Sequence, residues 1–235
     1  DGDGVVKALD DVSFTVDGGE FVAVTGPSGS GKSTLLAVAG LLLTPTSGRV
    51  LLDGVDLRDI RFSSLRERVV LVPQEGFLLD VTLAANVRLG TPEASDAQIR
   101  ATVDDLGLGD WLASLPAGLA TRVGPRGEAL SAGERQLVAI VRAAVADPDL
   151  LVLDEATSAV DPGTELRIAR ALRSLTRGRT SIAIAHRLST AEAADTVVVM
   201  DGGVVVEQGP HADLVGRGGR YSALHASWAS QQRHN

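Results

Sequence analysis

The residues best suited to chemistry form a glycine-rich loop between the apolar run 21–24 and the helix-like apolar segment 35–42. The loop consists of Gly26, Pro27, Ser28, Gly29, Ser30, Gly31, Lys32, Ser33 and Thr34. Glycines at both ends let successive N–H groups point inward, and a helix N-terminus adds positive potential where phosphates would sit. Lys32 then reaches the β- and γ-phosphates, and the Ser33 hydroxyl can ligate Mg²⁺. The pattern predicts a nucleotide-binding loop.

Two carboxylates, Asp154 and Glu155, follow the apolar run 150–153. Ligands of open α/β sheets gather at the carboxyl ends of such buried strands. Adjacent residues of a strand point in opposite directions, so the two side chains can have different roles. We expect Asp154 to hold Mg²⁺, directly or through water, and Glu155 to orient and deprotonate the attacking water.

Two further side chains close apolar runs that would end at the same sheet edge. His186 follows the run 182–185, and Gln74 follows the run 69–72. We expect His186 to donate to a γ-phosphate and Gln74 to contact water or Mg²⁺.

The segment Leu130–Glu134 is typical of a helix start, with Ser131 as N-cap and Glu134 completing a capping box. Because Gly133 lies beside this helix N-terminus, the segment is also a second anion site that the loop does not require. The segment Ser189–Glu192 has the same capping pattern, and we assign it no chemistry.

The apolar runs and helical stretches around these residues predict an α/β fold, with a P-loop NTPase core and a mostly parallel sheet. Short continuous apolar runs at 69–72, 150–153, 182–185 and 197–200 suit strands buried on both faces. Alternation over 12–16 and a turn at 17–20 predict a hairpin, and with a strand over 49–52 it would form a small N-terminal antiparallel β subdomain. Residues from about 78 to 146 show helical stretches, including 94–106 and 131–146, and are interpreted as an α-helical insert within one domain, 1–235.

The bulk composition limits the classes of partner and site. The chain has 235 residues, no cysteine and a net charge of −8. The missing cysteines exclude disulfides and thiolate zinc sites. The acidic balance argues against nucleic acid, which is bound mainly through Lys and Arg.

With these motifs in order, the chain resembles the nucleotide-binding domain of ABC transporters over nearly its whole length. The resemblance identifies Walker A at 26–33, the Q-loop glutamine at Gln74, the signature at 130–134, Walker B at 150–154 with Glu155, the D-loop at 158–161 and the switch histidine at His186. The segments 53–57, 121–127 and above all 185–190 resemble the exporter branch.

The resemblance implies a mechanism that needs two such domains. They would pack head to tail, as homodimer or heterodimer, with each ATP between Walker A of one and Ser131 and Gly133 of the other. Asp161 would act across this interface, and closure with Mg²⁺-dependent ATP hydrolysis would drive substrate across a membrane. The partners implied are transmembrane domains, expected upstream in the same parent chain, with the ATPase domain at the cytoplasmic face of the cell membrane.

Three departures from the family pattern concern contacts with nucleotide and membrane domains. Ala132 and Glu134 stand where the signature usually has glycine and glutamine, which predicts weaker binding across the dimer. Pro125 replaces a glutamate common in exporters. The aromatic that stacks on adenine is expected before Asp1, since the alternation over 12–16 points Phe14 into the core.

Three alternatives share parts of this pattern. An importer ATPase subunit has the same chemistry, but the segment 186–190 disfavours it. A soluble ABC ATPase acting on nucleic acid or ribosomes is disfavoured by the acidic balance and the absence of basic tracts. A nucleotide sensor without turnover would be expected to lack Glu155 or His186, and both are present.

Overall fold

The computed structural model describes residues 7–74, 76–154 and 161–232, without the side chains of the last two residues. Two compact units make up the chain. Unit 1 comprises residues 1–60, 152–155 and 180–235, and unit 2 comprises residues 61–151 and 156–179. Among the described residues no helix is both long and apolar enough to cross a membrane.

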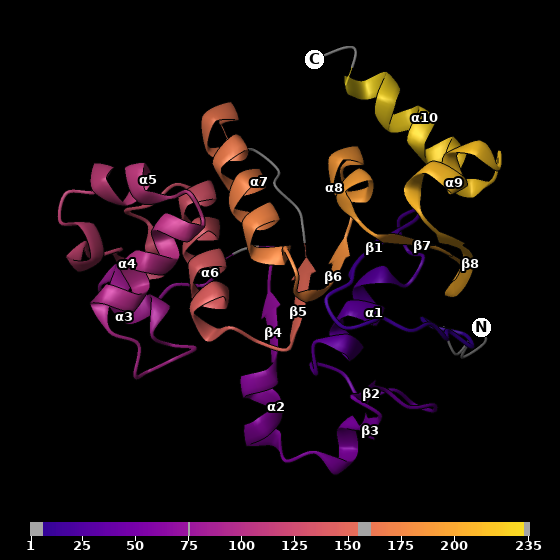
Figure 1. Ribbon diagram of the computed structural model, residues 1–235, viewed down its shortest axis with the longest axis horizontal. Coiled ribbons are helices and arrows are strands. Elements are labelled where there is room, and N and C mark those ends of the chain that lie inside the picture. The colour runs from indigo at the N-terminus through magenta and orange to yellow at the C-terminus, as the bar shows by residue number, and fades with distance from the viewer. Residues whose placement is uncertain (1–6, 75, 155–160, 233–235) are drawn as a thin grey trace, which may run out of the picture. The chain divides into compact units, whose positions relative to one another are not determined.

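Unit 1 is built on parallel strands (Figure 1). Its strands lie in the order β5-β6-β1-β7-β8. The elements are β1 (Phe21–Thr25), α1 (Lys32–Ala39), β2 (Leu51–Leu52), β3 (Val55–Asp56), the end of β5 (Leu150–Asp154), β6 (Thr180–Ile184), α8 (Leu188–Ala193), β7 (Thr196–Asp201), β8 (Val204–Gly209), α9 (His211–Gly216) and α10 (Arg220–Gln232). The central strand β1 is parallel to both β6 and β7, and β8 runs antiparallel to β7. A short 3₁₀ helix, Leu57–Asp59, follows β3.

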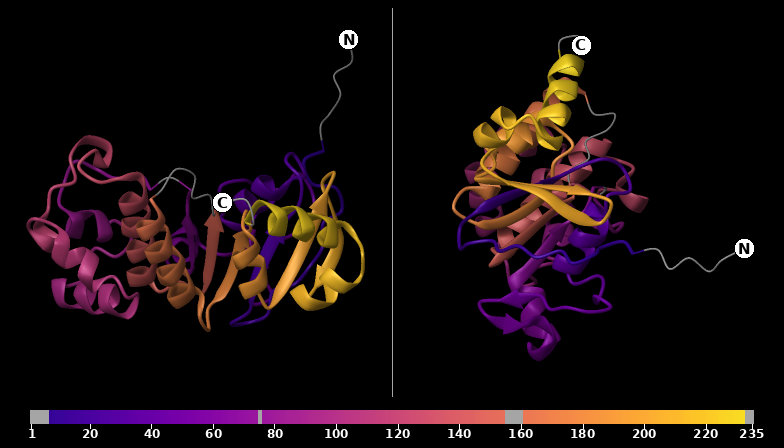
Figure 2. Two further views of the ribbon diagram at one scale, coloured as in Figure 1. Left: turned by 90° about the horizontal axis from the view of Figure 1, so that it is seen from above. Right: turned by 90° about the vertical axis from the view of Figure 1, so that its right-hand side faces the viewer.

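Helices α8, α9 and α10 pack against the sheet of unit 1. Val197 and Val199 of β7 join one buried cluster with Ala191 of α8, Leu214 of α9 and Tyr221 of α10. Strand alternation turns the neighbouring residues of β7 to the other face. In Figure 2 the yellow helices α9 and α10 lie against the strands β7 and β8. The long C-terminal helix therefore belongs to the core of unit 1.

Unit 2 is mainly helical. Its elements are α2 (Phe62–Arg68), β4 (Val69–Val72), α3 (Leu83–Val87), α4 (Asp96–Asp105), α5 (Gly109–Ser114), the 3₁₀ turns Gly118–Ala120 and Pro125–Gly127, α6 (Ala132–Ala146), the start of β5 and α7 (Pro162–Thr176). β4 comes next to β5 in the strand order. Helix α6 is amphipathic, and its buried face packs against α3, α4, α7 and β4.

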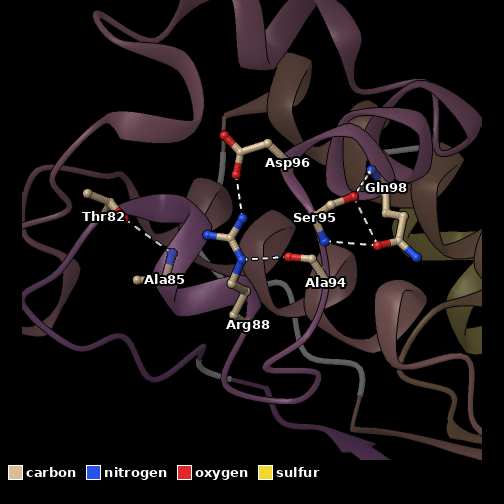
Figure 3. A network of polar contacts seen from close by, with 7 residues as sticks. All are labelled: Thr82, Ala85, Arg88, Ala94, Ser95, Asp96 and Gln98. Atoms are coloured by element: carbon tan, nitrogen blue, oxygen red, sulfur yellow. Dashed lines mark hydrogen bonds and ion pairs between the residues drawn. The ribbon is translucent and has the colours of Figure 1, made fainter.

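Polar side chains hold the start of this helical region in place. Arg88 follows α3 and donates from Nε to the carbonyl of Ala94, 2.6 Å away, while its guanidinium pairs with Asp96 (Figure 3). Ser95 caps α4, and the Gln98 side chain accepts from the Ser95 backbone N–H at 2.9 Å. This capping box satisfies two N–H groups that the first turn leaves free.

Several expectations about the elements are confirmed. The runs at 69–72, 150–153 and 197–200 lie within strands, the run at 182–185 does so up to Ile184, and residues 78–146 hold four α-helices but no named strand among the described residues. The turn at Asp53 and Gly54, both with positive φ, joins β2 to β3 as an antiparallel pair. The treatment of 78–146 as a separate insert stays a prediction.

Two expectations are wrong, and one strand was missed. Residues 12–16 form no strand, because β1 already pairs on both sides with β6 and β7 and has no edge left for a hairpin. The capping box at Ser189 is absent, since α8 begins at Leu188, two residues earlier than a Ser189 cap would place it, and Arg187 occupies its N-cap without a side-chain bond. Strand β8 was not predicted, although the turn at Gly202 and Gly203 and the valines that follow it indicate a hairpin.

Candidate functional site

The loop at 26–34 has a backbone that only glycine fits at two places. Gly26 has φ +145°, and a Cβ there would lie 2.0 Å from the carbonyl oxygen of Met200. Gly31 has φ +96°, and a Cβ there would lie 2.3 Å from the carbonyl oxygen of Ala8. Gly29, with φ +77°, has open space where a Cβ would be. The loop is therefore wedged between β7 and the segment that precedes the first strand.

Lys32 is held inside this loop. Its ammonium group donates to the carbonyls of Gly26 at 2.9 Å and Pro27 at 2.7 Å, and to the Ser30 hydroxyl at 3.3 Å. The side chain is buried, and burial lowers the pKa of Lys32. A buried cation with fixed direction is suited to stabilising phosphate charge.

The start of α1 supports the same chemistry. Gly31 is its N-cap, and no side chain caps the helix. The first turn carries no acidic residue. Ser33 is exposed at this turn. The helix N-terminus thus combines backbone donors and positive potential with a hydroxyl that can take a metal ion.

Strand register brings His186 to the edge at which this loop begins. Val24 of β1 is paired with Ile184 of β6 in a parallel register. Two residues further along each chain, Gly26 at the start of the loop and His186 therefore leave the sheet at the same edge. Burial lowers the pKa of His186, and the nearby Lys32 lowers it further, whereas Asp154 acts in the opposite direction. His186 is therefore close enough to both Lys32 and Asp154 to respond to their charges. The expectation that these groups act together on a nucleotide stays a prediction.

Asp154 ends β5 and is half-buried. Its neighbour Glu155, the predicted general base, lies outside the described residues, as do residues 158–160 of the predicted D-loop. Gln74 follows β4 in unit 2 and is exposed. The expectation that Gln74 joins the site stays a prediction.

The predicted signature helix, α6, starts as expected. The Ser131 hydroxyl accepts from the backbone N–H of Glu134 at 3.2 Å, and the Glu134 carboxylate accepts from the backbone N–H of Ser131 at 2.8 Å. Gly133 is buried, while Ser131 and Ala132 are exposed. The capping box leaves the Ser131 side chain at the surface of unit 2.

Trp111 is a partner of this motif that sequence reasoning missed. Its indole N–H donates to the second carboxylate oxygen of Glu134 at 3.2 Å. Both carboxylate oxygens of Glu134 therefore accept hydrogen bonds from groups of unit 2. No spacing in the sequence relates Trp111 to Glu134; its being one of two tryptophans was the available signal.

Asp161 has a local structural role. It is the N-cap of α7, and its side chain accepts from the backbone N–H of Thr164 at 3.0 Å. Hydrogen bonds from Thr164 lower the pKa of Asp161. The carboxylate is exposed and stays ionised, as a role at an interface would need.

Comparison with known proteins gives the same assignment as the motifs. Residues 9–158 match the family described as "ABC transporter". The chain is 45% identical over 221 residues to an ATP-dependent lipid A-core flippase of Ralstonia nicotianae, covering 93% of this chain and 37% of that protein. It is 43% identical over 225 residues to the ABC transporter ATM1 of Toxoplasma gondii, covering 95% of this chain and 20% of that protein.

A solved structure shows the same fold. The structure of a bacterial Atm1-family ABC exporter with ATP bound matches with a TM-score of 0.85 and 42% identity. The match covers 95% of this chain and 39% of that one. The chain therefore spans less than two fifths of the length of these relatives.

Proposed function

The chain belongs to the ABC transporter family, and from this premise we propose that it is the Mg²⁺-dependent ATPase domain of an exporter. The observation that carries the proposal is the position of the Lys32 ammonium, which is buried in the 26–34 loop and close enough to His186 to lower its pKa. The similarity to lipid A-core flippases and Atm1-family exporters matches the exporter features of 185–190. It does not favour the importer or nucleic-acid alternatives.

Each side chain of the site is assigned a role from its chemistry. Lys32 and the N–H groups of the loop bind the β- and γ-phosphates, and His186 donates to the γ-phosphate. The lowered pKa of His186 keeps the ring neutral at pH 7, with one N–H to donate. Glu155 orients and deprotonates the attacking water.

Mg²⁺ fits the oxygen donors at this edge. The exposed hydroxyl of Ser33 and the half-buried carboxylate of Asp154 are hard ligands of the kind that Mg²⁺ takes beside phosphates. When bound, the ion would neutralise charge on the phosphate oxygens. The Lys32 ammonium would add a second positive charge beside the same phosphates.

ATP would also connect two copies or two related chains. Ser131 is exposed at the N-terminus of the 15-residue helix α6, and Gly133 leaves room beside it, which suits contact with the phosphates of a partner's ATP. Asp161 would face the same interface. We assign the remainder of the transporter, including transmembrane domains, to parts beyond this chain, with the ATPase domain on the cytoplasmic side of the membrane.

Steady-state hydrolysis tests the catalytic assignment. Glu155→Gln keeps the shape of the side chain but removes the base, so we expect turnover to fall ~10²- to 10⁴-fold with ATP binding retained. The matched control is Glu93→Gln, which changes an exposed glutamate of unit 2. Turnover of Glu155→Gln within threefold of the control, or hydrolysis that persists in excess EDTA, would contradict the proposal.

Sedimentation with ATP tests the dimer. The Glu155→Gln protein should shift from monomer to dimer as ATP is added, and Ser131→Arg introduced into it should abolish the shift by filling the anion site. Ser63→Arg, at an exposed position on α2, is the matched control. Dimerisation that survives Ser131→Arg would exclude the signature helix from the interface.

A further inference from the structure

We propose that Glu192, His211 and His225 form a binding site for a divalent transition-metal ion such as Zn²⁺. One ligand atom from each side chain lies within 4.8 Å of the other two. The three residues come from three helices of unit 1, namely α8, α9 and α10, which lie together in Figure 1. The site is separate from the nucleotide chemistry assigned above, which uses none of these residues.

The ligand chemistry favours zinc over the Mg²⁺ of a nucleotide site. Two imidazoles and a carboxylate are a ligand set that Zn²⁺ takes, and imidazole also suits Cu²⁺ and Ni²⁺. Zn–N bonds of 2.0–2.1 Å place neighbouring ligand atoms of a tetrahedron about 3.3 Å apart. The three atoms, which lie within 4.8 Å of one another, would have to approach by at most about 1.5 Å to reach this spacing. Glu192 is exposed and both histidines are half-buried, so a fourth position is open to water.

Tyr221 orients one ligand. Its hydroxyl lies 2.7 Å from Nδ1 of His211, and the two rings meet edge to face. Tyr221 is fully buried, so its hydroxyl is shielded from water and kept beside His211. When Nδ1 carries the hydrogen and donates to Tyr221, Nε2 of His211 is left with the lone pair that a metal requires.

The second histidine is held close to the first. The rings of His211 and His225 have centroids 5.5 Å apart. The start of α10 is fixed by Glu207, whose carboxylate accepts from the backbone N–H groups of Arg220 at 2.5 Å and Tyr221 at 3.2 Å. His225 is one turn further along this helix. The ligands are thus carried by anchored backbone, as a metal site requires.

A bound metal would link the C-terminal helix to the rest of unit 1. Tyr221 of α10 is buried in the core cluster, and Leu224 and Trp228 pack against that cluster partly buried. An ion shared by α8, α9 and α10 would add a polar link to this apolar packing. The metal would therefore stabilise the docked position of α10.

Metal titration of the tag-free 235-residue chain, after treatment with a chelator and without nucleotide, tests the site. Zn²⁺ should bind with one-to-one stoichiometry in competition calorimetry, and Co²⁺ should develop the visible absorption of a four-coordinate site. We expect Glu192→Gln and His225→Gln each to lower the Zn²⁺ affinity by ~100-fold or more, since even loss of a residue that only orients a ligand costs 10- to 100-fold. His211 is left unchanged because its replacement would remove the partner of the buried Tyr221 hydroxyl.

Two variants serve as matched controls. Asp213→Asn removes an exposed carboxylate from α9, and Glu93→Gln removes an exposed carboxylate from unit 2. Both should bind Zn²⁺ like the parent, and Zn²⁺ should raise the melting temperature of the parent and the controls but not of His225→Gln. No one-to-one binding by the parent, or equal affinity in Glu192→Gln, His225→Gln and the controls, would overturn the proposal.

Discussion

Replacement of Gly26 by alanine tests whether the shape of the 26–34 loop is set by close backbone approach. A Cβ at this position would lie 2.0 Å from the carbonyl oxygen of Met200, 3.0 Å from its carbonyl carbon and 3.0 Å from the Ser30 hydroxyl. The oxygen belongs to the backbone of β7 and cannot rotate away. Either the loop or the strand must move.

The magnitude follows from two contributions. A residue other than glycine at φ +145° costs of order 1–3 kcal/mol in backbone strain. Forcing an extra carbon into packed surroundings typically costs another 1–3 kcal/mol. We therefore expect Gly26→Ala to lower the free energy of unfolding by about 2–6 kcal/mol.

The matched control is in the same loop. Gly29→Ala places a Cβ in open space, so it has only the cost of positive φ, about 1–2 kcal/mol. Urea unfolding of the parent and both variants gives the comparison. Equal losses for Gly26→Ala and Gly29→Ala would refute the account of the loop as wedged against β7.

Three further predictions concern the remaining site residues. Glu134→Gln keeps one acceptor oxygen for two donors, Trp111 and Ser131, so urea unfolding should show a loss of about 1–2 kcal/mol, and an unchanged free energy of unfolding would contradict the two bonds. Because the pKa of His186 is lowered, the folded protein favours the neutral ring, and this contribution to stability is complete above pH ~6.5 and lost as the pH falls below it. His186→Gln should therefore flatten the dependence of the free energy of unfolding on pH in that window. Parallel pH profiles of the parent and the variant would be contrary evidence. Asp161→Ala should destabilise the protein by ~1 kcal/mol through loss of the α7 cap, whereas Asp161→Asn, a good cap, should not; equal effects of the two changes would show that the cap is not the cause.

The parallel strands were predictable because each is a short apolar run buried on both faces. Short sequence motifs were enough to predict the glycine-rich loop, the capped helix at Ser131 and the position of His186 at the sheet edge, because each depends on only a few neighbouring residues. The hairpin at 12–16 failed for a reason that is not local: its alternation is correct, with Phe14 half-buried, but the neighbours of β1 come from residues more than 150 positions away. Strand pairing of this kind is decided by the whole sheet.

Contacts between distant side chains were equally beyond the sequence. The bond from Trp111 to Glu134 joins α5 to α6, and the cluster of Glu192, His211 and His225 joins three helices. Neither has a spacing that a helix or strand period would reveal. The histidines were visible only as two of four in the chain.

The most direct test of the central claim is the affinity for ATP of Lys32→Ala compared with Lys7→Ala, the change of the chain's other lysine. Lys7 is exposed and forms a surface ion pair with Asp10, so its loss should leave ATP binding unchanged. Lys32 is buried in the 26–34 loop, and hydrogen bonds to a charged group contribute about 1.5–3 kcal/mol, so if this loop binds the phosphates, calorimetry should show a dissociation constant ~10- to 150-fold higher for Lys32→Ala. If the two variants bind ATP with the same affinity, the 26–34 loop is not the phosphate site.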